Sequence, residues 1–310
     1  GMTVNRYCSS GLETIAIAQA KIEAGMADCI IAGGAESMSI MAMGGWRIVP
    51  NAKVGRENPS WYWGMGLTAE AVAKQYNVSR EDQDQFALNS HLKALNAIEK
   101  NIFKDEIVPI EVEHVFLDDD EKRQVNKFTV KTDEGPRKSS LESLAKLRPV
   151  FDPKNGTITA GNSSAISDGA SALLLTSSSY AERMGLEPMA RVKSVATAGV
   201  DPSIMGYGPV PAVKKALKLA GNTIDDIELF ELNEAFAAQA CAVSKALKLP
   251  QQKVNPNGGA IALGHPIGAT GAIILTKLVH ELIRTKGRYG MATMCIGGGQ
   301  GISVIVDCKI

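Results

Sequence analysis

The sequence predicts a layered α/β fold, and three observations lead to this prediction. Two short apolar runs, 28–34 and 290–295, end in or lead into glycines, as buried strands do. Each run follows a segment of helical periodicity, 12–24 and 268–284. The alternation of helix and strand continues from residue 209 toward the end of the chain. Helices and strands that alternate in this way pack as layers around a sheet.

The composition is that of a globular protein with two domains, or one large domain with an insertion. The 310 residues are 45% hydrophobic and 21% charged, which excludes the disordered and collagen-like classes. Lys plus Arg and Asp plus Glu number 33 each, so no overall field favours nucleic acid. No run approaches the roughly 18 apolar residues of a membrane helix. We therefore expect no nucleic-acid partner and no membrane span.

The cysteines and histidines indicate neither disulfides nor a metal site. The five cysteines are scattered and form no CxxC pair, which predicts reduced thiols in a cytoplasmic protein. None of the four histidines has the short spacing to Cys or carboxylate that zinc sites use, so no metal is expected. Residues 1–5 read as the middle of a domain. We therefore expect an incomplete N-terminal half, in which a targeting segment is not observable.

The first elements are a helix and a strand. Apolar side chains at helical spacing predict a helix over 12–24 that stops at Gly25. The run 28–34 then predicts a buried strand of a parallel sheet. Residues 41–65 carry Met, Gly, Trp and Pro without a clean period, so a loop is expected there, and loops often carry function.

A helical insertion is expected next. One helix fits 68–76, and a second begins at Ser79, because Ser79 and Asp82 have the spacing of a capping box. The acidic run 118–121, inside an irregular segment over 105–135, predicts a solvated hairpin tip.

The second half of the chain repeats the α/β alternation. We expect helices and strands in the order helix 209–220, strand 227–232, helix 233–247, helix 268–284 and strand 290–295. The block 255–299 echoes the block 5–34, since both combine a turn of small residues, a helix, a strand and glycines. This echo indicates an internal duplication.

Two cysteines lie where backbone N–H groups can stabilise a negative charge. Cys8, in Asn5-Arg-Tyr-Cys-Ser-Ser-Gly11, precedes a helix whose N-terminus can stabilise a thiolate. The alternative for Cys8 is a buried, inert thiol. Cys295, in Met294-Cys-Ile-Gly-Gly-Gly-Gln-Gly301, lies in a glycine loop whose unshielded amides can stabilise an oxyanion. The alternative there is a tight turn that needs positive φ.

A histidine and an asparagine complete the candidate set. His265, within the glycine-rich stretch 258–271, stays accessible and has a pKa suited to accept a thiol proton, although a structural role is the alternative. Asn233 follows the strand 228–232 and can orient a water, or else caps a helix. Because all four residues lie where strands end, they are expected to converge at one sheet edge.

These four motifs together resemble the thiolase family, and the resemblance runs over essentially the whole chain. It implies a five-layered αβαβα fold of two similar halves, with a loop domain inserted in the first. Residues 1–40 and 168–188 would belong to the N-terminal half, 41–167 to the loop domain and 189–310 to the C-terminal half. The chain departs from the family pattern by lacking most of the first half before its nucleophile strand.

The resemblance also implies a mechanism. Cys8 would attack the ketone of a 3-oxoacyl-CoA while His265 accepts the thiol proton, and Cys295 would protonate the departing acetyl carbanion. One oxyanion hole would use His265 and a water held by Asn233, and the other the backbone amides of Cys8 and Gly297. The related ketoacyl synthases carry a histidine in place of Cys295, so this residue favours a thiolase.

Coenzyme A enters this scheme as a substrate, and no cofactor is implied. By resemblance, Arg137 and Ser143 would lie near the nucleotide, Ser164 near the pantetheine and Met65 along the thioester channel. The alternative for the serines is ordinary turn chemistry, and for Arg137 an ordinary surface position. Because the family forms dimers and tetramers, we expect a homodimer or homotetramer.

The length of the substrate's acyl chain is the feature that the sequence determines least. Acetoacetyl-specific thiolases commonly have a histidine where this chain has Gly64, and the motifs Cys8-Ser-Ser-Gly11 and Gly161-Asn-Ser-Ser164 resemble the degradative type. This favours an acyltransferase of broad range that acts in β-oxidation of fatty acids. The alternatives are an acetoacetyl-CoA-specific acetyltransferase and a non-catalytic acyl-binding or lipid-transfer relative of the sterol carrier protein type. A further alternative is an inactive chain with an incomplete first domain.

Overall fold

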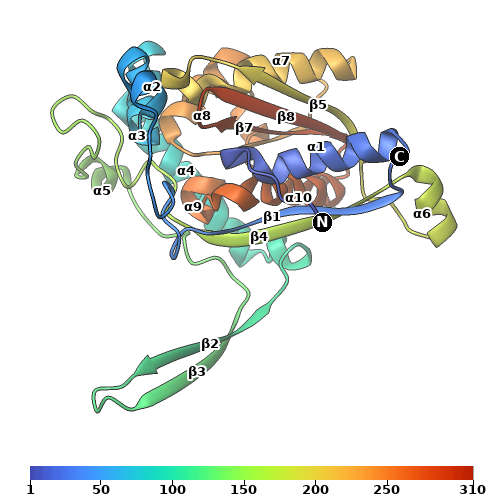
Figure 1. Ribbon diagram of the computed structural model, residues 1–310, viewed down its shortest axis with the longest axis horizontal. Helices are drawn as coiled ribbons and strands as arrows, with labels where there is room; N and C mark the ends of the chain where they lie inside the picture. The colour runs from blue at the N-terminus through green and yellow to red at the C-terminus, as the bar shows by residue number, and fades with distance from the viewer. Residues whose placement is uncertain (310) are drawn as a thin grey trace.

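The computed structural model describes residues 1–309, whose helices and strands stack in layers (Figure 1). The strands are β1 (Cys29–Ser37), β2 (Ile110–Leu117), β3 (Arg123–Val130), β4 (Asp168–Thr176), β5 (Arg191–Gly199), β6 (Leu229–Leu232), β7 (Tyr289–Ile296) and β8 (Gln300–Asp307). The α-helices are α1 (Ser10–Glu23), α2 (Ala52–Glu57), α3 (Met65–Gln75), α4 (Arg80–Glu99), α5 (Leu141–Ala145), α6 (Ser178–Met184), α7 (Pro209–Ala220), α8 (Ala237–Leu247), α9 (Ala260–Leu263) and α10 (Ile267–Thr285). Short 3-10 helices are η1 (Tyr7–Ser9), η2 (Pro59–Tyr62), η3 (Ile102–Asp105), η4 (Pro202–Tyr207) and η5 (Gln251–Lys253).

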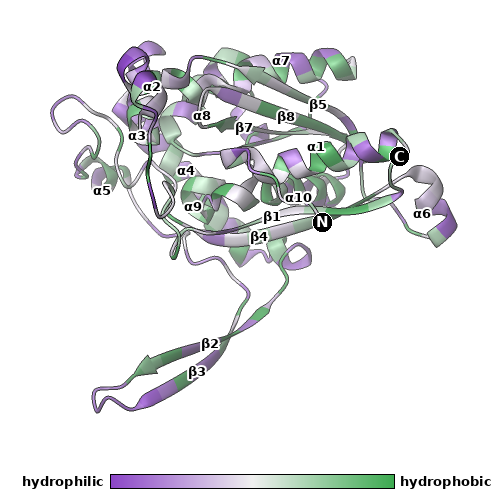
Figure 2. Ribbon diagram, viewed as in Figure 1, coloured by the Kyte–Doolittle hydropathy of each residue, from purple (hydrophilic) through white to green (hydrophobic). Residues whose placement is uncertain are grey.

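The main sheet has the strand order β5-β8-β7-β6. Only β6 and β7 run parallel, whereas β8 pairs antiparallel with both β5 and β7. Strands β7 and β8 are buried along most of their length, and β8 is largely green in Figure 2. One face of this sheet packs against α7 and α8, and the other packs against α1 and α10. The sheet therefore forms the centre of the core.

A second sheet, formed by β1 and β4, covers the other side of α1 and α10. Its inner face carries Ile30, Leu173 and Leu175, which pack into the core. On its outer face the cross-strand partners Ile31 and Leu174 are 77% and 56% exposed. The predicted strand is thus confirmed, but its assignment to a buried parallel sheet is wrong. The run is apolar on both faces, and that pattern did not reveal that β1 pairs antiparallel with β4.

The layers follow one another in the order α7 with α8, main sheet, α1 with α10, and the β1–β4 pair (Figure 1). This stacking confirms the layered α/β fold that the sequence predicts. The helices expected at 12–24, 209–220 and 268–284 form within two residues of those limits. Strands β5 and β8, for which we made no prediction, complete the main sheet.

The segment between β1 and β4 contains the expected helices, α3 and α4, together with long loops and the β2–β3 hairpin. Helix α4 begins after Ser79, whose side chain accepts from the backbone N–H of Asp82, and Asp82 accepts from the N–H of Ser79 in turn. The predicted capping box is therefore confirmed. Strands β2 and β3 form an antiparallel hairpin that projects from the body, with the acidic run at its tip (Figure 1). Among residues 1–309, no helix combines the length and the apolar character needed to cross a membrane.

Helices α1 and α10 approach unusually closely because glycines line their contact. A Cβ atom on Gly11 would lie 2.6 Å from the amide nitrogen of Ala272, and one on Gly271 would lie 2.2 Å from that of Leu12. Both distances are too short for real side-chain carbons, so this packing requires glycine on both helices. The contact brings the N-terminus of α1 next to the N-terminal turns of α10.

We predict that Gly271→Ala destabilises the protein by about 1–3 kcal/mol, because the added methyl group must push the two helices apart. Alanine favours a helix by up to about 1 kcal/mol, so any loss must come from the clash. Gly55→Ala on α2 is the matched control, since there a Cβ would meet only the Tyr62 ring at 3.9 Å. Urea unfolding measures both variants. Equal stability of Gly271→Ala and the wild type would contradict the close packing.

Candidate active site

Cys8 lies in the turn between the first residues and helix α1. It belongs to η1, and α1 begins two residues later at Ser10. The hydroxyl of Ser10 accepts from the N–H of Arg6 at 2.9 Å and donates to the carbonyl of Tyr7 at 2.7 Å. Tyr7 has φ +48°, a left-handed conformation that is uncommon for a bulky residue. The nucleophile candidate thus lies directly before a helix, as the sequence predicts, and the positive φ of Tyr7 shows in addition that the turn is partly strained.

The Cys8 thiol is 6% exposed, and two opposing effects act on it. Burial raises its pKa, because the charged thiolate loses solvation. The backbone N–H groups of Gly297 and of Cys8 itself donate to the sulfur and lower the pKa, but burial outweighs them. We expected the helix N-terminus to favour a thiolate, whereas the structure favours the neutral thiol in the resting state. The Cys8 and Gly297 amides therefore favour charge on this sulfur, against the effect of burial.

Cys295 is fully buried in β7, one residue before the end of the strand, which leads into the turn Gly297–Gly299. Gly298 and Gly299 have φ +85° and +88°, so this turn uses the conformations that the glycine run allows. The Cys295 side chain packs with Met205 and Ala235. Burial and the neighbouring Cys8 thiol both raise the pKa of Cys295. The two cysteines therefore lie close together, and both are neutral at physiological pH.

His265 lies between α9 and α10, and its hydrogen bonds determine its tautomer. Nδ1 lies 2.7 Å from the hydroxyl oxygen of Thr270, and that hydroxyl donates its only proton to the carbonyl of Pro266 at 2.8 Å. Nδ1 must therefore carry the proton and donate it to Thr270, which leaves Nε2 as a free acceptor. Burial lowers the pKa of His265 to about 4. The imidazole is thus neutral, with Nε2 as its acceptor nitrogen. His265 is only 6% exposed, so the expectation that it stays accessible is wrong.

Asn233 follows β6, and its amide Nδ2 lies 3.5 Å from Nε2 of His265. Its Oδ1 is buried and accepts no hydrogen bond from residues 1–309. The predicted start of a helix at Asn233 is wrong, since α8 begins at Ala237 with Phe236 as N-cap. Between Asn233 and α8, the carbonyl of Ala235 accepts two hydrogen bonds from Ser164, both at 3.1 Å, and Phe236 is extended. Asn233 is therefore not an N-cap.

The substrate-binding candidates divide into two groups. Met65, at the start of α3, packs against the Cys295 cluster, and its sulfur would lie 3.5 Å from a Cβ on Gly297. Ser164 bonds to Ala235 in the same cluster. Arg137 and Ser143 are exposed, and their hydrogen bonds stay within the loop segment, to His91 and Ser140. The structure thus brings Met65 and Ser164 beside the cysteines but shows no such link for Arg137 and Ser143.

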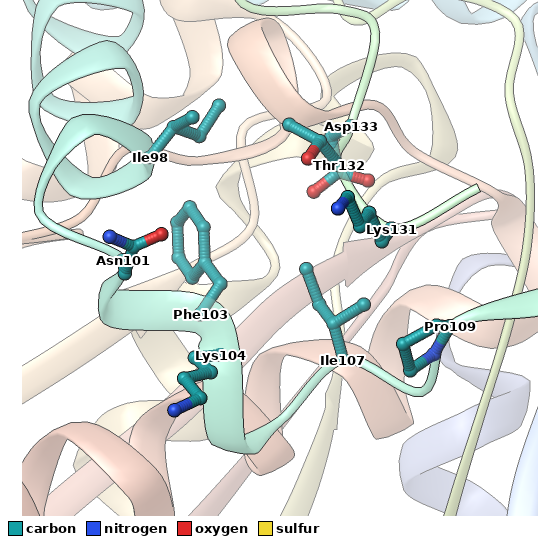
Figure 3. Close-up of a pocket in the computed structure, with 9 residues that line it drawn as sticks. All are labelled: Ile98, Asn101, Phe103, Lys104, Ile107, Pro109, Lys131, Thr132 and Asp133. Carbon is teal, nitrogen blue, oxygen red and sulfur yellow. The ribbon is translucent and has the colours of Figure 1, made fainter. Parts of the chain in front are cut away.

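A hollow of about 350 Å³ lies elsewhere, at the base of the β2–β3 hairpin (Figure 3). It is lined by the end of α4, by η3 and by the chain after β3, with the Phe103 ring and Ile107 on its apolar side. None of the candidate residues lines it. Its position therefore gives it no part in the chemistry of the two cysteines.

Three residues of the site escaped the sequence reasoning. Thr270 fixes the tautomer of His265, and Arg6 and Gln300 bond to each other beside Cys8. Thr270 had a weak signal, a hydroxyl residue five positions after the histidine in the first turn of a helix. The Arg6–Gln300 pair had none, because its members lie 294 positions apart.

Comparison with known proteins places this arrangement in a family. Residues 1–179 match the family model for the N-terminal domain of thiolase, and residues 186–308 match the one for the C-terminal domain. The chain therefore belongs to the thiolase family of acyltransferases.

Individual relatives agree with this assignment. The 3-ketoacyl-CoA thiolase of Bacillus subtilis is 50% identical over 307 residues, covering 99% of this chain and 78% of that protein. The acetyl-CoA acetyltransferase of Escherichia coli is 47% identical over 321 residues, covering 99% and 79%. A crystal structure of human mitochondrial 3-ketoacyl-CoA thiolase in complex with CoA superposes with a TM-score of 0.87 at 40% identity, covering 99% and 77%.

We predict that His265 stays neutral, protonated on Nδ1, from pH 8 down to pH 5, because burial holds its pKa at about 4. Long-range ¹H–¹⁵N spectra of the imidazole rings test this, and with only four histidines the signal is assigned by comparison with His265→Gln. Titration near the ordinary pKa of about 6.5 would contradict the described burial.

The same shift predicts a pH dependence of stability. Because the folded pKa of His265 lies below its unfolded value, the unfolded chain binds more protons as the pH falls from about 6.5 to 4. The wild type should therefore lose roughly 3 kcal/mol relative to His265→Gln across this window. Urea unfolding of both proteins at a series of pH values measures the difference. If the difference in free energy of unfolding between the two proteins did not change with pH, His265 would have the same pKa in the folded and unfolded states.

Proposed function

We propose that the chain cleaves 3-oxoacyl-CoA with free CoA to give acetyl-CoA and a shortened acyl-CoA, through an acyl group carried on Cys8. The main support is that the Gly297 amide acts on the pKa of Cys8 and Cys8 on that of Cys295, while the Asn233 amide lies 3.5 Å from Nε2 of His265. Such a pair of thiols fits a reaction in which one sulfur attacks a carbonyl and another exchanges a proton with carbon.

In the first half-reaction, the proton of the Cys8 thiol passes to Nε2 of His265 as the sulfur attacks the ketone carbon of the substrate. The bond between the α and β carbons then breaks, and its electron pair stays on the acetyl-CoA fragment. Cys295 gives its thiol proton to that carbanion, so that acetyl-CoA leaves. Cys8 then carries the acyl group, His265 is protonated and Cys295 is a thiolate.

In the second half-reaction, free CoA takes the acyl group from Cys8. The Cys295 thiolate accepts the proton of the CoA thiol, and the resulting CoA thiolate attacks the Cys8 thioester. The shortened acyl-CoA leaves as the Cys8 sulfur takes back its proton from His265. All three residues return to their starting protonation states, and the same steps reversed give the Claisen condensation.

The protonation states support this order of events. The pKa of Cys8 is raised and that of His265 is lowered by burial, so the resting pair is neutral thiol and neutral imidazole. The thiolate must then form as the substrate is attacked. The Thr270 hydroxyl, which accepts from Nδ1, keeps Nε2 free to receive the proton.

Two groups of donors suit the developing oxyanions. The amides of Cys8 and Gly297 point at the sulfur, where the thioester oxygen of the acyl-enzyme would lie. Nε2 of protonated His265 and a water held by Asn233 would serve the other carbonyl, and the unpaired Oδ1 of Asn233 offers such a water an acceptor. Loss of one oxyanion donor typically lowers kcat by about 10²- to 10³-fold.

The CoA contacts are proposed from the resemblance together with position. Met65 and Ser164 lie beside the cysteines and suit the thioester channel and the pantetheine. Arg137 and Ser143 are exposed, and the guanidinium of Arg137 offers charge to a phosphate. We further propose a homodimer or homotetramer, as the family resemblance implies, which light scattering tests.

We propose that the enzyme also accepts 3-oxoacyl-CoA substrates with acyl chains longer than acetoacetyl. A Cβ added to Gly64 would meet no atom within 4 Å. There is therefore free space next to Met65, in which a longer acyl chain could lie. An acetoacetyl-CoA-specific acetyltransferase is the second candidate, because a relative named acetyl-CoA acetyltransferase is 47% identical. The presence of both cysteines, His265 and Asn233 speaks against a non-catalytic acyl-binding protein.

The test is CoA-dependent cleavage of acetoacetyl-CoA and of a 3-oxoacyl-CoA with a longer chain, followed by loss of the 3-oxoacyl absorbance. We expect cleavage of both, and its loss in Cys8→Ala. The control is Cys241→Ala, which removes a thiol whose pKa burial raises to about 12 and which lies on α8. Cleavage of acetoacetyl-CoA alone would contradict the broad range, and activity in Cys8→Ala would contradict the mechanism.

A further inference from the structure

The guanidinium of Arg6 connects three segments that surround Cys8. Its Nε and Nη2 donate to Oε1 of Gln300 at 3.1 and 3.0 Å, and its Nη1 donates to Glu13 on α1 at 2.7 Å. Arg6 lies two residues before the nucleophile, whereas Gln300 begins β8. The Arg6 and Glu13 side chains are only 27% and 20% exposed, so solvent competes little for these bonds.

Gln300 is itself fixed by the main sheet. It pairs with Ile296 of β7 and with Gly199 of β5, and it therefore closes the turn Gly297–Gly299. Its side chain reaches from this turn to Arg6. The two N–H groups that Arg6 donates to the side-chain oxygen of Gln300 thus join the turn that carries Cys8 to the turn Gly297–Gly299.

We infer that Arg6 and Gln300 are positioning residues that hold the Cys8 sulfur under the backbone N–H of Gly297, an inference that rests on the proposed role of Cys8. Tyr7, between Arg6 and Cys8, is held at φ +48°, which costs on the order of 1 kcal/mol and persists only if its neighbours are fixed. Arg6 supplies this constraint on one side and α1 on the other. Without the bond to Gln300, Tyr7 can relax and turn the sulfur away from Gly297.

The contact with Gly297 has a measurable consequence. Its N–H lowers the pKa of Cys8, so loss of that hydrogen bond raises the pKa and slows alkylation. The neighbouring titratable group is the Cys295 thiol from β7, and the Glu13 carboxylate of α1 is paired with Arg6. His265, proposed to take the Cys8 proton, lies in the segment before α10. None of them is changed in a Gln300 variant. Such a variant also keeps the Arg6 charge, which separates positioning from simple electrostatics.

The experiment measures the rate at which iodoacetamide alkylates Cys8 as a function of pH, with Cys8→Ala giving the background. We expect the apparent pKa of Cys8 in Gln300→Met to rise by about half a unit to one unit, which slows alkylation at pH 8 by about three- to tenfold. Arg6→Met should act likewise. Arg6→Met also breaks the ion pair with Glu13, so the double variant should equal Arg6→Met, which already lacks the bond to Gln300. Arg288→Met, which breaks the ion pair with Asp307 at the far end of β8, is the matched control and should change nothing.

A pH profile of Gln300→Met that superimposes on the wild type would overturn the inference, and so would additive effects in the double variant. Circular dichroism establishes that each variant folds. If Gln300→Met does not fold, Arg6→Lys replaces it, because lysine keeps the charge but lacks the paired N–H groups, and an unchanged profile would again overturn the inference. These outcomes are separate from the proposed function, which fails if Cys8→Ala still cleaves substrate.

Discussion

The close contact between α1 and α10 is the constraint on which the site depends. Gly11 and Gly271 let the two helix backbones meet because glycine has no Cβ atom. The resulting contact leaves no room for a Cβ at either position. Cys8 lies just before the first helix and His265 just before the second. The packing of these helices therefore sets how the turn that carries Cys8 and the segment that carries His265 lie relative to each other. The main sheet then adds Cys295 and the glycine turn from β7.

Burial explains the electrostatics of the site. It raises the pKa of both cysteines and lowers that of His265, so all three side chains rest in their neutral forms. Hydrogen bonds then decide what each group can do. The Thr270 hydroxyl fixes which imidazole nitrogen accepts a proton, and the Gly297 amide lowers the pKa of Cys8 against the effect of burial. In the proposed mechanism, the Cys8 proton therefore moves only as a substrate carbonyl is attacked.

Much of the fold followed from local patterns, whereas features that depend on distant partners did not. The capping box at Ser79 and the helix before Gly25 were predicted because a few neighbouring residues determine them. The antiparallel pairing of β1 with β4 was missed, since an apolar run does not reveal its partner. In the site, the glycine motifs drew attention to Cys295 and His265. Thr270 and the Arg6–Gln300 pair act through contacts that only the folded chain reveals.

The central claim is that Cys8 carries the acyl group while Cys295 only exchanges a proton. Mass spectrometry after acid quenching of the protein with 3-oxoacyl-CoA, in the absence of free CoA, tests it directly. The account predicts an acyl adduct on the peptide that contains Cys8 and none on the peptide that contains Cys295, with the adduct removed when CoA is added before the quench. An adduct on Cys295, or none on Cys8 while substrate is being cleaved, would contradict it.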